Sequence, residues 1–112
     1  MNLVKLEIPS HPAYLTTLRL VTASVAQKMG FDIEAVEDLR VGVSEAINYL
    51  LSSNERFSIL FDEDPKEGLV ITIQAKMQED ASDKGRLHHM IMESLLDGVE
   101  DDPDGIVLIK HL

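Results

Sequence analysis

The 112-residue sequence contains no cysteine and no tryptophan, and it has few basic residues. Without cysteine the chain forms neither disulfide bonds nor a thiolate zinc site. Its 10 basic and 20 acidic residues give a net charge of −10, which repels phosphate backbones and argues against a nucleic-acid partner. The acidic excess is most simply explained by solubility, and a basic protein partner is the functional alternative.

Long apolar runs are absent as well. No stretch approaches the ~20 apolar residues of a membrane span, and the opening residues, MNLVKLEIP, do not read as a signal peptide. We therefore expect a cytoplasmic protein with no membrane partner. Aromatic residues make up only 4% of a chain that is 45% hydrophobic, so the core of this single domain must consist mainly of aliphatic side chains.

The segment from Phe31 to Ser53 is the strongest pattern in the chain. Its apolar residues recur at intervals of three and four, which predicts a helix with one buried stripe. Asp32 is placed to cap its start, and Gly30 to end the segment before it. Glu45 and Asn48 lie close to the stripe. They either reach water at its edge or line a ligand pocket, and the pattern leaves both interpretations open.

Two further amphipathic segments, three alternating segments and a final strand segment complete the chain. Helices are predicted at 12–29 and 86–97, the first capped by Ser10 or His11 and the second ended by Gly98. Strands are predicted at 3–8, 57–61, 69–75 and 106–112, with polar turns at 62–68 and 101–105. In the last helix, the predicted apolar line is formed by Leu87, Ile91 and Leu95, with Met90 beside it.

This order, β-α-α-β-β-α-β, predicts an α+β fold. Because the strands alternate and the helices are amphipathic, we expect a two-layer sandwich with three helices on one face of a four-stranded sheet, mixed or antiparallel. The strands on either side of 62–68 should form a hairpin, and the first two helices should pack antiparallel.

Three segments resemble, in order and spacing, the anti-sigma factor serine kinases of the RsbW type, in the histidine-kinase-like ATPase superfamily. TLRLVTAS, which contains Arg19, is similar to the family's first helix, and VSEAIN is similar to its first nucleotide-binding motif. MESLLDGVEDDPDGIVLIKHL is similar to its last helix, turn and strand. The resemblance implies one histidine-kinase-like ATPase domain over residues 1–112, without the usual ATP lid.

The family's first motif, Glu-x-x-x-Asn, is only half present. Its glutamate, the base toward the attacking hydroxyl, matches Glu45, but Tyr49 stands where the magnesium-binding asparagine belongs. Asn48 is one position early and therefore points ~100° away around the helix. Glu45 and Asn48 are the only nucleotide-binding residues that the match suggests.

The glycine-rich motifs of the family are missing. The adenine-binding aspartate falls on Ala75, and its two glycines fall on Met77 and Glu79. The second glycine pair falls on Arg86 and His88, after a loop that is short for a lid. Because an adenine edge left without a partner costs roughly 1–3 kcal/mol for each buried polar group, we expect ATP binding to be lost or weak.

Three hypotheses for function follow. The first is a non-catalytic anti-sigma-factor-like regulator that needs no cofactor, binds a sigma factor or an anti-anti-sigma protein through Arg19, and forms a homodimer. The second is an ATP- and magnesium-dependent serine kinase in which Glu45 is catalytic. The third is a sensor of a small ligand bound near Arg86, His88 and Glu45. No metal site is expected, since His88 and the adjacent His89 point apart on a helix.

Overall fold

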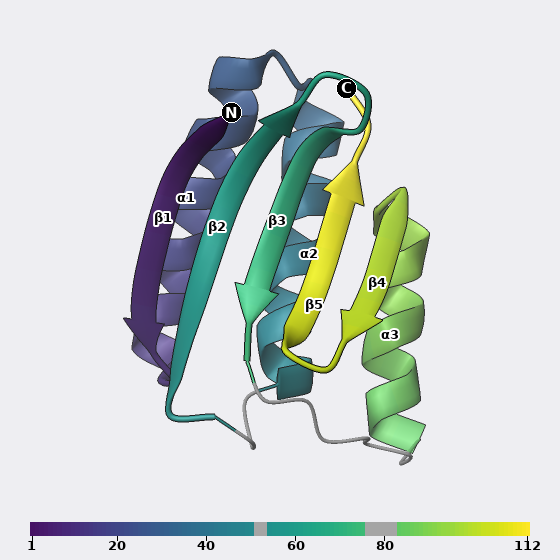
Figure 1. The fold of residues 1–112 in the computed structure, drawn as a ribbon. Coiled ribbons are helices and arrows are strands. Elements are labelled where there is room, and N and C mark those ends of the chain that lie inside the picture. The colour runs from purple at the N-terminus through teal and green to yellow at the C-terminus, as the bar shows by residue number, and fades with distance from the viewer. Residues whose placement is uncertain (51–53, 76–82) are drawn as a thin grey trace.

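The computed structural model describes residues 1–50, 54–75 and 83–112, which fold as a sheet with helices on one side (Figure 1). The described residues form three helices and five strands, in the order β-α-α-β-β-α-β-β. They are β1 (Asn2–Pro9), α1 (Pro12–Met29), α2 (Ile33–Leu50), β2 (Arg56–Asp64), β3 (Gly68–Gln74), α3 (Asp83–Leu95), β4 (Gly98–Asp102) and β5 (Gly105–Lys110).

The sheet has five strands in the order β1-β2-β3-β5-β4, and every neighbouring pair is antiparallel. The predicted α+β class and the β2–β3 hairpin are thus confirmed, and of the two predicted sheet types, mixed or antiparallel, the sheet is the antiparallel one. The predicted count of four strands is wrong, because 98–102 forms strand β4 where we expected a helix end followed by a turn. Its three acidic residues suggested a turn, but β4 is an edge strand whose exposed side chains need no apolar partner.

The β4–β5 hairpin depends on the glycine that follows its turn. Gly105 has a φ of +150°, and a Cβ atom there would lie 1.9 Å from the carbonyl oxygen of Ile73. Only glycine therefore lets β5 pair with β3 at this point. The turn itself is shorter than the sequence suggests, since it consists of Pro103 and Asp104 alone.

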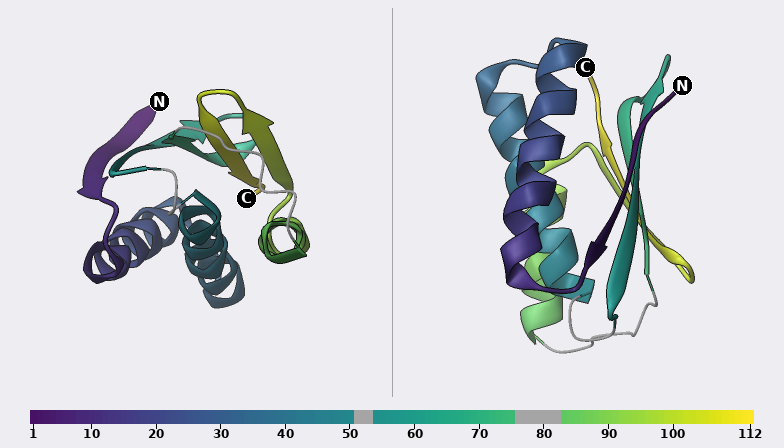
Figure 2. Two further views of the ribbon diagram at one scale, coloured as in Figure 1. Left: turned by 90° about the horizontal axis from the view of Figure 1, so that it is seen from below. Right: turned by 90° about the vertical axis from the view of Figure 1, so that its left-hand side faces the viewer.

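All three helices cover the same face of the sheet, as both views of Figure 2 show. The core between the layers is aliphatic and phenylalanine-based, as the scarcity of aromatic residues predicts. Its fully buried large side chains are Leu18, Leu39, Leu50, Phe57, Ile59, Phe61, Leu69, Ile71, Ile73, Met92, Ile106 and Leu108. None of the helices in the described ranges is long and apolar enough to cross a membrane.

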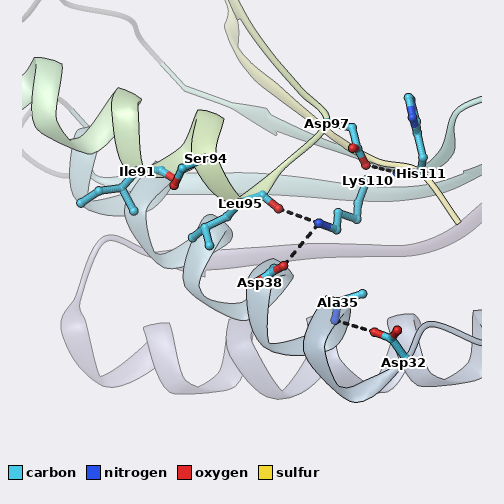
Figure 3. Close-up of polar contacts among 9 residues, drawn as sticks. All are labelled: Asp32, Ala35, Asp38, Ile91, Ser94, Leu95, Asp97, Lys110 and His111. Carbon is cyan, nitrogen blue, oxygen red and sulfur yellow. Dashed lines mark hydrogen bonds and ion pairs between the residues drawn. The ribbon is translucent and has the colours of Figure 1, made fainter.

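The predicted caps of the first two helices are confirmed. The side chain of His11 accepts a hydrogen bond from the N–H of Ala13 at 3.0 Å, and Pro12 opens α1. Gly30 ends α1 in the left-handed conformation. The carboxylate of Asp32 accepts a hydrogen bond from the N–H of Ala35 at 2.8 Å, which caps α2 (Figure 3).

The buried face of α3 differs from the predicted one. Leu87 is 54% exposed and Met90 is 65% exposed, whereas Met92 and Leu96 are buried. The apolar line is therefore shifted by one residue, which corresponds to a rotation of about 100° about the helix axis. The rotation turns His88 and His89 toward the protein, where both are half-buried. Periodicity alone does not reveal it, since each of the two alternative lines has helical spacing.

Candidate functional site

Helix α2 carries the residues that the sequence singles out, and it packs against α1 on one side and α3 on the other. We call these contacts the α1–α2 seam (Arg19, Arg40, Ser44) and the α2–α3 seam (Gly42, Glu45, Tyr49, His88, Leu96). Glu45 belongs to the α2–α3 seam, whereas Asn48 is exposed and takes no part in it.

The centre of the α2–α3 seam is a carboxylate–imidazole pair. Nδ1 of His88 lies 2.5 Å from Oε2 of Glu45, and the two side chains are only 16% and 19% exposed. At this distance the ring nitrogen donates a hydrogen bond to the carboxylate, and half-burial strengthens the contact. The glutamate that the resemblance suggests as a base thus has an internal partner from α3.

The next turn of the seam places Tyr49 against a second histidine. The rings of Tyr49 and His89 meet edge to face with 6.1 Å between their centroids. Nδ1 of His89 lies 2.7 Å from Glu93, and its Nε2 lies 3.1 Å from Asp101 on β4. Because the two carboxylates contact opposite nitrogens of one ring, they do not converge on a common metal position.

At its other end the α2–α3 seam is closed by close packing. A Cβ atom on Gly42 would lie 3.0 Å from Cδ1 of Leu96, so the absence of a side chain at position 42 lets the two helices approach. The seam is therefore tight at the level of Gly42 and polar at the level of Glu45.

Lys110 of β5 fixes the same end of α3, as Figure 3 shows. Its Nζ donates to the carbonyl oxygen of Leu95 at 2.7 Å and lies 3.5 Å from Oδ2 of Asp38 on α2. Asp97 accepts a hydrogen bond from the N–H of His111 at 2.6 Å. A single half-buried lysine thus joins the last turn of α3, helix α2 and the sheet, and it satisfies a carbonyl group that the helix end leaves free.

The α1–α2 seam is built around a buried hydroxyl group. Nε of Arg19 donates to Oγ of Ser44 at 2.5 Å, and Oγ in turn donates to the carbonyl oxygen of Arg40 at 2.9 Å. Ser44 is only 3% exposed. Arg19 is therefore half-buried and held against α2.

The remaining residues of the family motifs lie apart from this cluster or outside the described ranges. Ala75 follows β3, and its N–H donates to the carbonyl oxygen of Asp104 at 3.0 Å. Arg86 is exposed on α3. Met77 and Glu79 fall within 76–82, which the structure does not describe.

Some contacts were not predicted from the sequence. The third hypothesis places His88 near Glu45, because the resemblance puts both residues at the family's nucleotide site, but it does not predict that the two side chains bind each other directly across 43 residues of sequence. The contacts of Lys110 could have been predicted from its place in an apolar strand. A lysine on the buried side of a strand needs hydrogen-bond acceptors nearby. Arg40 carried no signal beyond its charge.

Together these elements define an α+β protein with a layered fold like that of the histidine-kinase-like ATPases, in which the central helix presents a glutamate to the neighbouring helix. No family model matches the chain. It is similar to the Serine-protein kinase RsbW of Oceanobacillus iheyensis, with 41% identity over 56 residues, which are 46% of this chain and 35% of that protein.

Two further relatives bear the same name. The Serine-protein kinase RsbW of Bacillus pumilus is 41% identical over 46 residues, which are 41% of this chain and 28% of that protein. That of Listeria monocytogenes serotype 4a is 43% identical over 44 residues, which are 39% of this chain and 28% of that protein. The matches confirm the relation to the RsbW-type anti-sigma factor kinases over part of the chain, and they cover about a third or less of each relative.

Proposed function

We propose that this protein is an anti-sigma-factor-like regulator that acts by binding a protein partner and does not use ATP. Similarity to RsbW proteins supports the regulatory class. The observation that supports the loss of ATP use is the contact between Glu45 and His88. Glu45 is the one residue that matches the family's catalytic glutamate, and its carboxylate is bound within the protein.

The residues at the family's nucleotide-binding motif positions do not fit a magnesium nucleotide. Tyr49 offers a ring in place of an amide oxygen, and Ala75 offers a methyl group in place of the carboxylate that would accept from adenine. Arg86 and His88 stand where glycines would let a backbone approach phosphate groups. The proposal therefore assigns the α2–α3 seam to holding α3 in place.

The partner in this proposal is a sigma factor or an anti-anti-sigma protein, and Arg19 is its contact. The half-buried position of Arg19 supports this role, because the hydrogen bond from its Nε to Ser44 orders the side chain before a partner binds. Pre-ordering a long side chain reduces the entropy lost on binding. Arg19→Glu should abolish capture of the partner while the far-ultraviolet circular dichroism spectrum stays unchanged.

Calorimetry with Mg-ATP and Mg-ADP tests the loss of nucleotide binding. We expect no heat of binding at millimolar nucleotide, together with measurable binding of the source organism's RsbW-regulated sigma factor or anti-anti-sigma protein. Micromolar nucleotide binding would contradict the first half of the proposal. Absence of binding to both proteins would contradict the second.

The second candidate function is a serine kinase, which the name of the relatives and the retained Glu45 favour. It predicts transfer of phosphate from ATP to an anti-anti-sigma protein, and loss of that transfer in Glu45→Ala. A wild-type protein that transfers no phosphate removes this candidate.

A homodimer remains part of the proposal. Leu60, Val70 and Val107 alternate with the buried residues of central strands, so they lie on the face of the sheet opposite the core, and each is half-buried. A second copy would remove these side chains from water. Light scattering at several concentrations should give twice the monomer mass, and Leu60→Glu should give the monomer mass.

A further inference from the structure

The region around α1 differs in charge from the rest of the protein. Helix α1 contains two basic residues, Arg19 and Lys28, and no acidic one, in a chain with 20 acidic residues. On α2, the acidic Asp38 and Glu45 contact Lys110 and His88 and are thereby drawn to the α3 side. At the α1–α2 seam itself the charged residues are therefore Arg19 and Arg40, with Glu37 beside Arg40, whereas Lys28 lies on the exposed side of α1.

Arg19 retains donors for an external acceptor. Its Nε is used by Ser44, but within 1–50, 54–75 and 83–112 neither Nη1 nor Nη2 forms a hydrogen bond. A guanidinium group that is fixed at Nε and open at its two ends is suited to a carboxylate, which it can bind in a bidentate manner.

Arg40 lies on the α2 side of the same seam and is only loosely paired. Its Nη1 is 3.2 Å from Oε2 of Glu37, and the two side chains are 40% and 62% exposed. An exposed pair of this kind contributes little to stability. The Nε of Arg40 is buried and has no partner among the described residues, which is an unfavourable state for an N–H donor. Because the pair with Glu37 is exposed and weak, a carboxylate supplied from outside can compete with Glu37 for Nη1 of Arg40.

An exposed apolar residue follows each arginine in the sequence, about 100° further around its helix. Leu20, next to Arg19, is 63% exposed, and Val41, next to Arg40, is 36% exposed. Arginine beside exposed apolar groups is typical of protein–protein contact surfaces, whereas a phosphate backbone would make no use of Leu20 and Val41.

We propose that the α1–α2 seam binds an acidic, partly apolar segment of a protein partner, and that Arg40 is a second anchor beside Arg19. The proposal rests on the proposed function for the identity of the partner, but its chemistry can be tested with synthetic peptides. Carboxylates of the segment would pair with Arg19 and Arg40, and its apolar side chains would cover Leu20 and Val41.

The first experiment records the Nε–H signals of Arg19 and Arg40 by nuclear magnetic resonance, assigned with Arg19→Lys and Arg40→Lys. The probes are a synthetic helical peptide of leucine and glutamate and its counterpart with lysine in place of glutamate. We expect the acidic peptide to shift both arginine signals and the basic peptide to shift neither. Failure of the acidic peptide to shift the Arg40 signal would overturn the proposal, whatever the natural partner.

The second experiment measures binding of the purified sigma factor to Arg40→Gln, with Lys28→Gln as matched control. Lys28 has the same charge, but it lies on the exposed side of α1, bonded to Ser24 at 3.1 Å. We expect Arg40→Gln to weaken binding about tenfold and Lys28→Gln less than about twofold. Equal effects would overturn the role of Arg40 and leave the proposed function standing, whereas absence of wild-type binding would count against the proposed function.

Discussion

The two seams of α2 use the same helix in opposite ways. Toward α3, Glu45 is bound by His88 and Asp38 by Lys110, and Gly42 lets Leu96 approach closely. Toward α1, Ser44 holds one end of Arg19, and both Arg19 and Arg40 keep donors that have no acceptor among the described residues.

The difference indicates that the α2–α3 seam stabilises the fold, whereas the α1–α2 seam provides a binding surface. Polar groups that are fully paired within the protein fix helices in place but offer nothing to a ligand. Partly paired guanidinium groups add less to the fold and remain able to bind. Substitutions in the α2–α3 seam should therefore change stability most, and those in the α1–α2 seam should change partner binding most.

The largest effect on stability is expected from Gly42→Leu. The new side chain would overlap Leu96 and force α3 away from α2, so the free energy of unfolding should fall by about 1–3 kcal/mol. Urea unfolding measures the change. The neighbouring Val41→Leu, on the exposed side of the helix, should stay within about 0.5 kcal/mol. Similar losses for the two variants would show that the seam is not tightly packed.

A double-mutant cycle of Glu45→Gln and His88→Ala should give a coupling energy of about 1–2 kcal/mol, because the half-buried pair loses its interaction in either single variant. Binding of the partner should not change. The matched cycle is Glu67→Gln with His111→Ala, whose side chains are about half exposed, and its coupling should be below about 0.5 kcal/mol. Equal coupling in the two pairs would remove the special role of Glu45 and His88.

These contrasts show where sequence patterns are informative. Hydrophobic period, His11, Gly30 and Asp32 predicted the helices and their caps, because such signals act over a few residues. They missed strand β4, whose exposed edge position needs no apolar alternation. They also missed the rotation of α3, because its orientation depends on contacts with α2 and β5 that are distant in the sequence. The Glu45–His88 pair has the same origin, and periodicity carries no information on it.

Ser44→Ala tests the α1–α2 seam from within. Loss of the buried hydroxyl group leaves Nε of Arg19 without its acceptor, so unfolding free energy should fall by about 1 kcal/mol. Partner binding should weaken about threefold, since Arg19 must then be ordered on binding. Ser24→Ala, which removes the exposed acceptor of Lys28, is the control and should change neither quantity. Unchanged partner binding in Ser44→Ala would mean that the hydrogen bond from Arg19 to Ser44 does not order Arg19 for binding.

Asp64 provides a reference outside both seams, with the smallest expected effect. Its carboxylate accepts hydrogen bonds from the N–H groups of Glu67 and Lys66 in the β2–β3 turn, which lowers the pKa of Asp64 below its ordinary value of 3.8. A lowered pKa means that the folded state favours the anion. This contribution to stability is therefore present above pH 3.8 and disappears as the pH falls through the folded-state pKa.

Asp64→Asn tests this contribution. The variant should melt slightly below wild type at pH 7 and together with it at the lowest pH at which both fold. Partner binding and the Glu45–His88 coupling should not change. A melting difference that persists undiminished in acid would show that the turn depends on the shape of the side chain and not on its charge.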